Sequence, residues 1–302
     1  MRSVFLGPNG IRAGWRLLIF ALILAAIAVA IFVIVGAGAY LAGYHGVGAE
    51  LLSERHSGKV APAGIAFSEG VVLTASLIAV WIMSRIEHRP MGRFGLPLAQ
   101  AFRSKFWEGA LVGFVSISLV LLAVYAVGDF RILGLREAGG ALVLDAIEWA
   151  GAFVIVGLSE EFLFRGYAQF TVTTGMGFWF AALLTSAAFS FAHTGNHGEG
   201  ALGIAHVFVF ALVFSLVLWR TGNLWFGVGF HFAWDWGQTY FYGAPDSGFV
   251  TPQAFLSSRF SGPAWLSGSP TGPEGSIFGI GVLILVAIYA WFRFKGRIVS
   301  AP

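Results

Sequence analysis

Residues 142–168 read LVLDAIEWAGAFVIVGLSEEFLFRGYA, a mostly apolar run that carries two adjacent acids and an arginine near its end. At about 1.5 Å per residue, a helix of this length crosses a bilayer core about 30 Å thick. Charged groups inside such a helix are costly, so each of them requires a reason. The stretch therefore predicts a membrane helix with a polar site inside it.

The composition of the whole chain agrees with a membrane protein. Of its 302 residues, 57% are hydrophobic and 11% are charged, whereas a soluble domain carries about 25% charged residues. This disfavours a soluble enzyme, a nucleic-acid-binding protein and a disordered chain, and a net charge of +3 is too small for a phosphate-binding surface. The absence of cysteine excludes disulfides, a thiolate nucleophile and cysteine-ligated metal sites.

We expect an all-α, polytopic membrane helix bundle of about eight transmembrane helices, in a single integral membrane domain spanning residues 1–302. The apolar segments that predict these helices are residues 15–43, 63–84, 107–128, 142–168, 177–194, 201–219, 222–242 and 277–294. In the first segment, an apolar run follows Arg12 and Arg16, as in a signal peptide. Its apolar run exceeds the roughly 7–15 residues of a signal peptide and lacks a clear small-residue cleavage site, so we interpret it as a retained span.

The lysines and arginines are distributed unevenly over the predicted loops. A cytoplasmic N-terminus places twelve of them inside: Arg2, Arg12, Arg16, Arg85, Arg89, Arg93, Arg103, Lys105, Arg220, Arg293, Lys295 and Arg297. Five fall outside, namely Arg55, Lys59, Arg131, Arg136 and Arg259, and Arg165 lies within a span. The excess inside is the one that the positive-inside rule requires, and it predicts that both termini are cytoplasmic.

Two predicted loops differ from the others. Residues 85–106 are basic and are expected to lie along the anionic cytoplasmic surface. Residues 243–276 are rich in Gly, Ser and Pro and form a long outer loop. That loop is either a cap over part of the bundle or a linker.

The two acids in residues 142–168 have different expected partners. Glu161 and Arg165 are i,i+4 neighbours with the acid on the N-terminal side, the favourable orientation for an ion pair. Glu160 points about 100° away and has no partner within the motif. Desolvation moves an unpaired carboxylate toward proton exchange near neutral pH, as general acid–base catalysis requires. The alternative is one buried ion cluster of all three groups that holds helices together.

Two later spans contribute histidines. His193 ends the fifth span, and His231 lies in the seventh, where Asp235 four residues later can orient its ring. A lone membrane histidine can equally serve as a hydrogen-bond partner between helices, an interpretation that suits His206 in the sixth span best. Four further acids near the ends of spans are expected to be interfacial: Glu69, Glu108, Asp145 and Glu148.

Glu160, His193, His231 and Asp235 project from three different apolar helices, so residues 142–242 form the predicted catalytic core. Such a set can hold a water, or a metal ion, inside the bilayer. At about 1.5 Å per residue, Glu160 and His231 lie roughly 12 and 13 Å from the inner ends of their spans, whereas His193 lies roughly 23 Å from its own. This difference requires the fifth helix to start later or to tilt.

Three motifs on successive apolar segments resemble those of the CPBP family, the CAAX-protease and bacteriocin-processing intramembrane proteases. The motifs are Glu160-Glu161-xxx-Arg165, Phe189-xxx-His193 and His231-xxx-Asp235. A fourth stretch, Arg93-Phe94-Gly95-Leu96, resembles one often found ahead of the core in that family. The eight predicted spans agree with the family's architecture.

The resemblance implies hydrolysis of a peptide bond inside a membrane, which we expect to be a prokaryotic plasma membrane. Glu160 is then the general base that activates water, and His193 positions that water or shares its proton. Glu161 and Arg165 support the site. His231 binds the developing oxyanion, assisted by the residue four positions later.

At that last position the sequence departs from the CAAX-processing pattern, which has Asn where this chain has Asp235. An amide can donate to an oxyanion, whereas an ionised carboxylate repels it. Asp235 must therefore be protonated, orient His231, or bind a metal.

Two mechanisms stay open at this point. Glu160, His193 and His231 can supply three ligands to a Zn²⁺ ion with an open position for water. Alternatively, the same residues act on water without a metal. No span carries an i,i+4 histidine pair of the HExxH type, which favours the metal-free mechanism.

The expected substrate is a peptide or membrane protein in the bilayer, such as a prenylated CAAX protein or a leader peptide, and nucleic acid is not an expected partner. The same residues are compatible with two other functions. One is a catalytically silent scaffold or immunity-type protein that binds a peptide. The other is a proton-coupled transporter, which predicts paired broken helices at the midplane that the sequence does not show.

Overall fold

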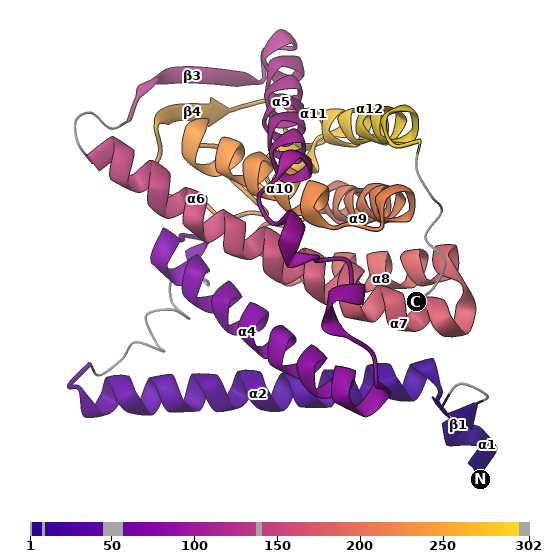
Figure 1. The fold of residues 1–302 in the computed structure, drawn as a ribbon. Coiled ribbons are helices and arrows are strands. Elements are labelled where there is room, and N and C mark those ends of the chain that lie inside the picture. The colour runs from indigo at the N-terminus through magenta and orange to yellow at the C-terminus, as the bar shows by residue number, and fades with distance from the viewer. Residues whose placement is uncertain (1, 8–9, 45–56, 137–140, 296–302) are drawn as a thin grey trace.

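The computed structural model describes residues 2–7, 10–44, 57–136 and 141–295, which form a bundle of helices (Figure 1). Arg55 and Arg297, two of the cations counted above, lie outside these ranges. The α-helices are α1 (Arg2–Phe5), α2 (Ala13–Leu41), α4 (Pro62–Glu87), α5 (Ser104–Ala126), α6 (Ala141–Glu160), α7 (Gln169–Met176), α8 (Phe178–His193), α9 (Ala201–Thr221), α10 (Trp225–Asp235), α11 (Ala264–Ser267) and α12 (Ile277–Arg293). The shorter elements are the 3₁₀ helices η1 (Met91–Arg93), η2 (Leu98–Gln100) and η5 (Pro273–Gly275), the π-helices η3 (Glu161–Ala168) and η4 (Trp236–Phe241), and the strands β1 (Leu6–Gly7), β2 (Gly10–Ile11), β3 (Phe130–Leu135) and β4 (Leu256–Phe260).

Every predicted apolar segment is helical, so the chain is a helical, polytopic integral membrane protein, as predicted. In the described part of the chain, five helices are long and apolar enough to cross a membrane: α2, α4, α5, the continuous helix Leu142–Met176 and α9. Helices α8 and α12 are apolar but shorter. Length and composition therefore support a multi-span bundle without fixing the number of spans at eight.

The fourth helix is longer than predicted. Its α6, η3 and α7 parts are continuous from Leu142 to Met176, eight residues beyond the predicted end at residue 168. Gly177, with a φ of +82°, separates it from α8. The sequence did not reveal this extension because residues 169–176 are polar enough to resemble a loop, although several of them are buried in the protein.

Two helices of the core pack backbone against backbone. A Cβ atom on Gly109 of α5 would lie 2.1 Å from the carbonyl oxygen of Phe226 in α10, and one on Gly113 would lie 2.3 Å from that of Phe230. In return, a Cβ on Gly229 would lie 2.0 Å from the carbonyl oxygen of Phe106. Small residues four apart permit this close approach between membrane helices, and here they fix α10, the helix that carries His231.

Both helices that carry predicted catalytic acids change from α to π geometry directly after the acid. Glu160 ends α6 and is followed by η3, within which Gly166 has a non-helical ψ of −111°. Asp235 ends α10 and is followed by η4. A π-helical turn is wider than an α-turn and often marks a functional site.

The predicted outer loop, residues 243–276, folds across one end of the bundle. It contains β4, which pairs antiparallel with β3 (Figure 1), and it reaches the start of α4, where Val60 N–H donates to the carbonyl oxygen of Val250. The indole N–H of Trp149 in α6 donates to the carbonyl oxygen of Gln253 at 3.1 Å. The loop therefore covers the bundle and is not a simple linker.

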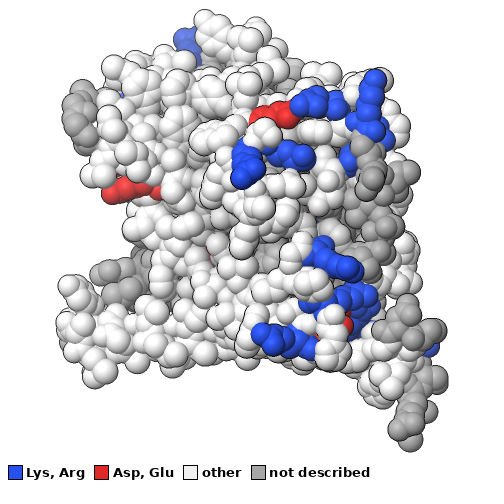
Figure 2. Space-filling model, in the orientation of Figure 1, with Lys and Arg blue, Asp and Glu red and all other residues white. Residues whose placement is uncertain are grey.

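The opposite end of the bundle is basic. Lysines and arginines gather on one side of the molecule (Figure 2), where α4, α9 and α12 end and α5 begins. This basic face includes Arg85, Arg93, Lys105, Arg220 and Arg293. It contains the predicted basic segment 85–106.

Candidate active site

A cavity of about 620 Å³ lies between the core helices and the loop 243–276. All four of the predicted catalytic residues line it, although they come from α6, α8 and α10: Glu160, His193, His231 and Asp235. Apolar side chains such as Phe153 and Phe210 form much of the remaining wall. A few polar groups converging in an apolar cavity are typical of a binding or catalytic site.

His231 lies at the centre of the charged groups. Its Nε2 is 3.4 Å from Glu160 Oε2 and 3.5 Å from Asp235 Oδ2, and its Nδ1 is 3.4 Å from Glu161 Oε1. Both ring nitrogens therefore face carboxylate oxygens. The predicted contact between His231 and Asp235 is present, and the structure adds a contact with Glu160 that the sequence did not predict.

Glu161 and Arg165 form the predicted ion pair, with Glu161 Oε1 and Arg165 Nη1 3.3 Å apart and both side chains almost completely buried. The guanidinium also lies over the ring of Phe189 in α8, 4.2 Å from its centroid. Arg165 thus connects α8 to the fourth helix. Glu160 remains outside this pair, and 19% of its side chain is exposed to the cavity.

His193 is positioned by its own helix. Its Nδ1 lies 2.8 Å from the carbonyl oxygen of Phe189, one turn earlier. A carbonyl oxygen only accepts hydrogen bonds, so Nδ1 carries the proton and Nε2 is left as an acceptor. His193 therefore offers a basic nitrogen to the cavity.

The difference in depth expected from the sequence disappears in the structure. Because the fourth helix continues to Met176, Glu160 lies about 24 Å from that end, and His193 lies about 23 Å from the start of α8. His231 follows the start of α10 by only six residues, yet it contacts Glu160. Helix α10 therefore begins inside the bundle, consistent with the burial of nearly all of its residues.

In this structure, the three candidate zinc ligands Glu160, His193 and His231 do not lie together as one group. Among the described residues, the only group of three or more potential ligands whose atoms lie within 4.8 Å of one another is Asp235, Asp246 and Glu274. Glu160, His193 and His231 do not form such a group. Nδ1 of His193 faces a carbonyl oxygen and Nδ1 of His231 faces Glu161, so the nitrogen that each ring directs to the cavity is Nε2.

Three acids of the cavity were not assigned to it from the sequence: Glu69, Asp246 and Glu274. Glu69 was expected at the interface, but its Oε2 accepts a hydrogen bond of 2.6 Å from Ser159 Oγ, next to Glu160. The two others lie in the loop 243–276, whose composition gave no sign that it reaches the site. The sequence signal that could have identified Asp246 and Glu274 is their presence as acids in a loop that is otherwise nearly free of charge.

His206 differs from its expected role between helices. Neither of its ring nitrogens has a hydrogen-bond partner in the described part of the chain, and its exposed fraction is only 2%. The ring instead lines the cavity. The expectation of an interhelical hydrogen bond was therefore wrong.

The acids in the segments outside the membrane helices are held in a desolvated environment. Burial raises the pKa of Asp246, although the hydrogen bond from Thr239 opposes the shift. Burial also raises the pKa of Glu274 well above its ordinary value, and the neighbouring Asp246 raises it further. Burial raises the pKa of Glu199, in the turn before α9, to about 7. The loop side of the cavity thus gathers two acids, Asp246 and Glu274, that retain their protons at unusually high pH.

Residues 142–237 match the family model of the type II CAAX prenyl endopeptidase Rce1-like proteins. The matched segment contains all of the predicted catalytic residues and runs from α6 into η4. This match confirms the resemblance to the CPBP family of intramembrane proteases. No curated protein matches the chain.

Proposed function

We propose that the protein is an intramembrane endopeptidase that uses Glu160 to activate water. The observation that carries this proposal is the division of labour between the two adjacent acids. Arg165 is paired with Glu161, whereas Glu160 is directed to the cavity and contacts His231. An acid that lacks a permanent cationic partner, in a largely apolar cavity, is suited to take and release a proton.

In the proposed reaction, the Glu160 carboxylate removes a proton from water as the water oxygen attacks the carbonyl carbon of the peptide. The neutral Nε2 of His193 accepts a hydrogen bond from the same water and orients it. His231, with a proton on Nε2, donates to the carbonyl oxygen as negative charge develops there. The C–N bond then breaks, the proton passes from Glu160 to the leaving amine, and the products are a carboxylic acid and a free amine.

The supporting residues act through the catalytic ones. Glu161 lies 3.4 Å from His231 Nδ1 and so orients the ring from its far side. Arg165 connects Glu161 to Phe189, the residue whose carbonyl group fixes His193. The two histidines are therefore positioned by one connected network. We propose no step through a zinc ion held by Glu160, His193 and His231, because those residues do not converge on one point.

We propose further that the substrate reaches the site from the side opposite the basic face. Glu274 lies three residues before the start of α12 and belongs to the cavity, whereas Arg293 ends the same helix on the basic face. The positive-inside rule places the basic face in the cytoplasm, so the cavity lies toward the outer side. A leader peptide or another membrane protein exposed on that side fits this arrangement better than a prenylated CAAX protein in the cytosol.

The proposal is tested by comparing the wild type with Glu160→Gln, expressed at equal levels in the native host. New protein termini in the membrane and secreted fractions are mapped by mass spectrometry. We expect a set of termini that only the wild type and the control Glu148→Gln produce, because Glu148 is an exposed acid of the same helix. Identical termini with all three proteins would refute the protease proposal and favour the alternative function, a catalytically silent scaffold that binds a peptide.

A further inference from the structure

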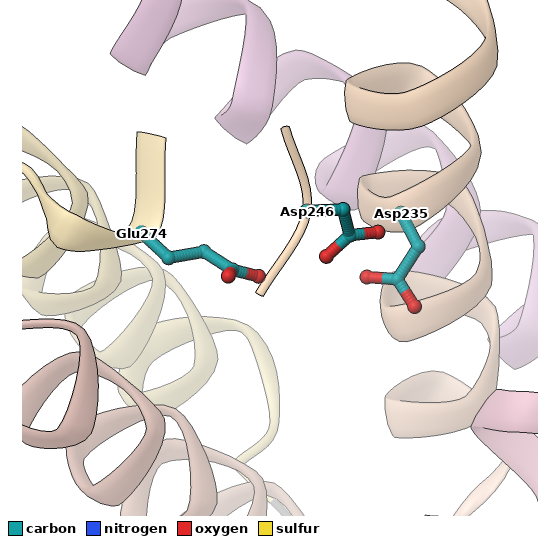
Figure 3. Close-up of side chains that lie close together, drawn as sticks. All are labelled: Asp235, Asp246 and Glu274. Atoms are coloured by element: carbon teal, nitrogen blue, oxygen red, sulfur yellow. The ribbon is translucent and has the colours of Figure 1, made fainter. Parts of the chain in front are cut away.

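Three carboxylates from separate parts of the chain converge on the loop side of the cavity (Figure 3). Asp235 comes from the end of α10, Asp246 from the loop after η4, and Glu274 from η5. One oxygen from each lies within 4.8 Å of the others. Carboxylates repel one another at this distance unless protons or a cation neutralise them.

The two loop carboxylates are held in place by hydrogen bonds to one of their oxygens. Thr239 Oγ1 donates to Asp246 Oδ2 at 2.8 Å. The backbone N–H of Ser247 and its hydroxyl donate to Glu274 Oε2 at 2.9 and 3.1 Å. Such second contacts orient ligands around a bound ion. They also hold the two acids together, although repulsion would separate them.

Protein cations do not balance this charge. In the described ranges, no lysine or arginine forms a salt bridge with any of the three acids. The ion-pair partner of Asp235 is His231, and His231 is shared with Glu160 and Glu161. The three carboxylates are therefore neutralised either by protons that they retain or by a cation that the described residues do not supply.

A second observation comes from His206. Its ring is 98% buried, lines the same cavity, and has no hydrogen-bond partner among the described residues for either nitrogen. It lies against the turn that carries Glu274, because a Cβ on Gly279 would be 2.8 Å from His206 Nδ1 and 3.0 Å from the carbonyl oxygen of Pro273. Buried polar nitrogens are rarely left without a partner. A water bound to a metal ion in the cavity would donate the hydrogen bond that the unprotonated ring nitrogen of His206 lacks.

We propose that Asp235, Asp246 and Glu274 bind a divalent cation of the Ca²⁺ class. Carboxylate oxygens are the preferred ligands of such hard cations, and Ca²⁺–oxygen bonds of about 2.3–2.6 Å place opposite ligands about 5 Å apart, as the spacing here requires. The cation fastens the loop 243–276 to α10. It also neutralises Asp235, so that this acid no longer opposes negative charge developing beside His231.

This site does not depend on the proposed protease activity, and its test measures binding alone. The full-length protein in detergent is treated with a chelator and titrated with Tb³⁺, a Ca²⁺ analogue that emits light when a nearby tryptophan is excited. Trp234 precedes Asp235 and serves as the donor. We expect a single saturable signal that Ca²⁺ abolishes by competition, with affinity reduced roughly tenfold or more by Asp246→Asn and by Glu274→Gln.

The matched control is Glu148→Gln, which removes an exposed acid outside the cluster and is expected to bind Tb³⁺ as the wild type does. Circular dichroism and gel filtration establish that each variant is folded. If a variant fails to fold, the wild type alone decides: Ca²⁺ must raise the melting temperature of the chelator-treated protein. Absence of a saturable signal, equal affinity in the variants, or no thermal shift with Ca²⁺ would overturn the proposal.

Discussion

The ion pair between Glu161 and Arg165 offers a quantitative test of how the site is held together. The two groups are 3.3 Å apart, and the exposed fractions of their side chains are 0% and 1%. Coulomb's law at this separation, with an effective dielectric constant of about 20, gives an attraction of about 5 kcal/mol. Removing one partner leaves the other charge buried and unpaired, which typically costs about 3–5 kcal/mol. Removing both leaves no such charge.

We therefore expect Glu161→Gln and Arg165→Met each to lower the free energy of unfolding by about 3–5 kcal/mol, and the double variant to lose less than the sum by about 3 kcal/mol or more. The free energies are measured by denaturant titration in mixed micelles, followed by circular dichroism. A neutral double variant no longer orients His231, so it should regain stability without regaining activity. Losses that add within about 0.5 kcal/mol would refute the reasoning, because independent sites behave in that way.

Three further predictions concern packing, pH and orientation. Gly113→Ala should lower the free energy of unfolding by about 1–3 kcal/mol and reduce activity, because its Cβ would lie 2.3 Å from the carbonyl oxygen of Phe230. The control Gly70→Ala, with nothing within 4 Å of its Cβ, should change neither. Equal melting temperatures of the two variants would contradict the close packing of Gly113. In the presence of a chelator, the melting temperature should fall as the pH rises from about 5 to about 8, because the pKa of Glu199 is about 7 in the folded protein against 4.5 when unfolded. The folded state therefore binds an extra proton at low pH and loses that stabilisation as the pH rises. Glu199→Gln should flatten this profile, and an unchanged slope would exclude Glu199 as its cause. Since the chain has no cysteine, an impermeant maleimide on intact cells should label Ser261→Cys but not Ala99→Cys, and the reverse result would invert the proposed orientation.

The architecture was largely predictable, because burial in lipid imposes long apolar helices that are visible in one sequence. The ion pair between Glu161 and Arg165 could be predicted from helix periodicity alone, and so could the contact between His231 and Asp235. The boundary after residue 168 was not predictable. Residues 169–176 are only partly apolar, yet residues 169–173 are buried in the protein, and hydropathy does not register protein contacts.

The candidate site was predictable in its residues but not in its surroundings. Hydropathy and motif spacing identified Glu160, yet they did not show that Glu160 contacts His231, because that contact joins residues of two helices that are 71 positions apart in the chain. Asp246 and Glu274 were missed for a related reason. A loop has no periodicity from which the direction of a side chain follows, so only the tertiary structure shows that the loop reaches the cavity.

The most direct test of the central claim is the rate at which the purified protein cleaves a peptide that contains a mapped cleavage junction. The wild type and Glu160→Gln are reconstituted in vesicles at equal concentration, with melting temperatures measured in parallel. Loss of a general base is expected to lower the rate about 10²–10⁴-fold while leaving the melting temperature essentially unchanged. Cleavage by Glu160→Gln at the wild-type rate would contradict the account, because Glu160 could then not be the general base that activates water.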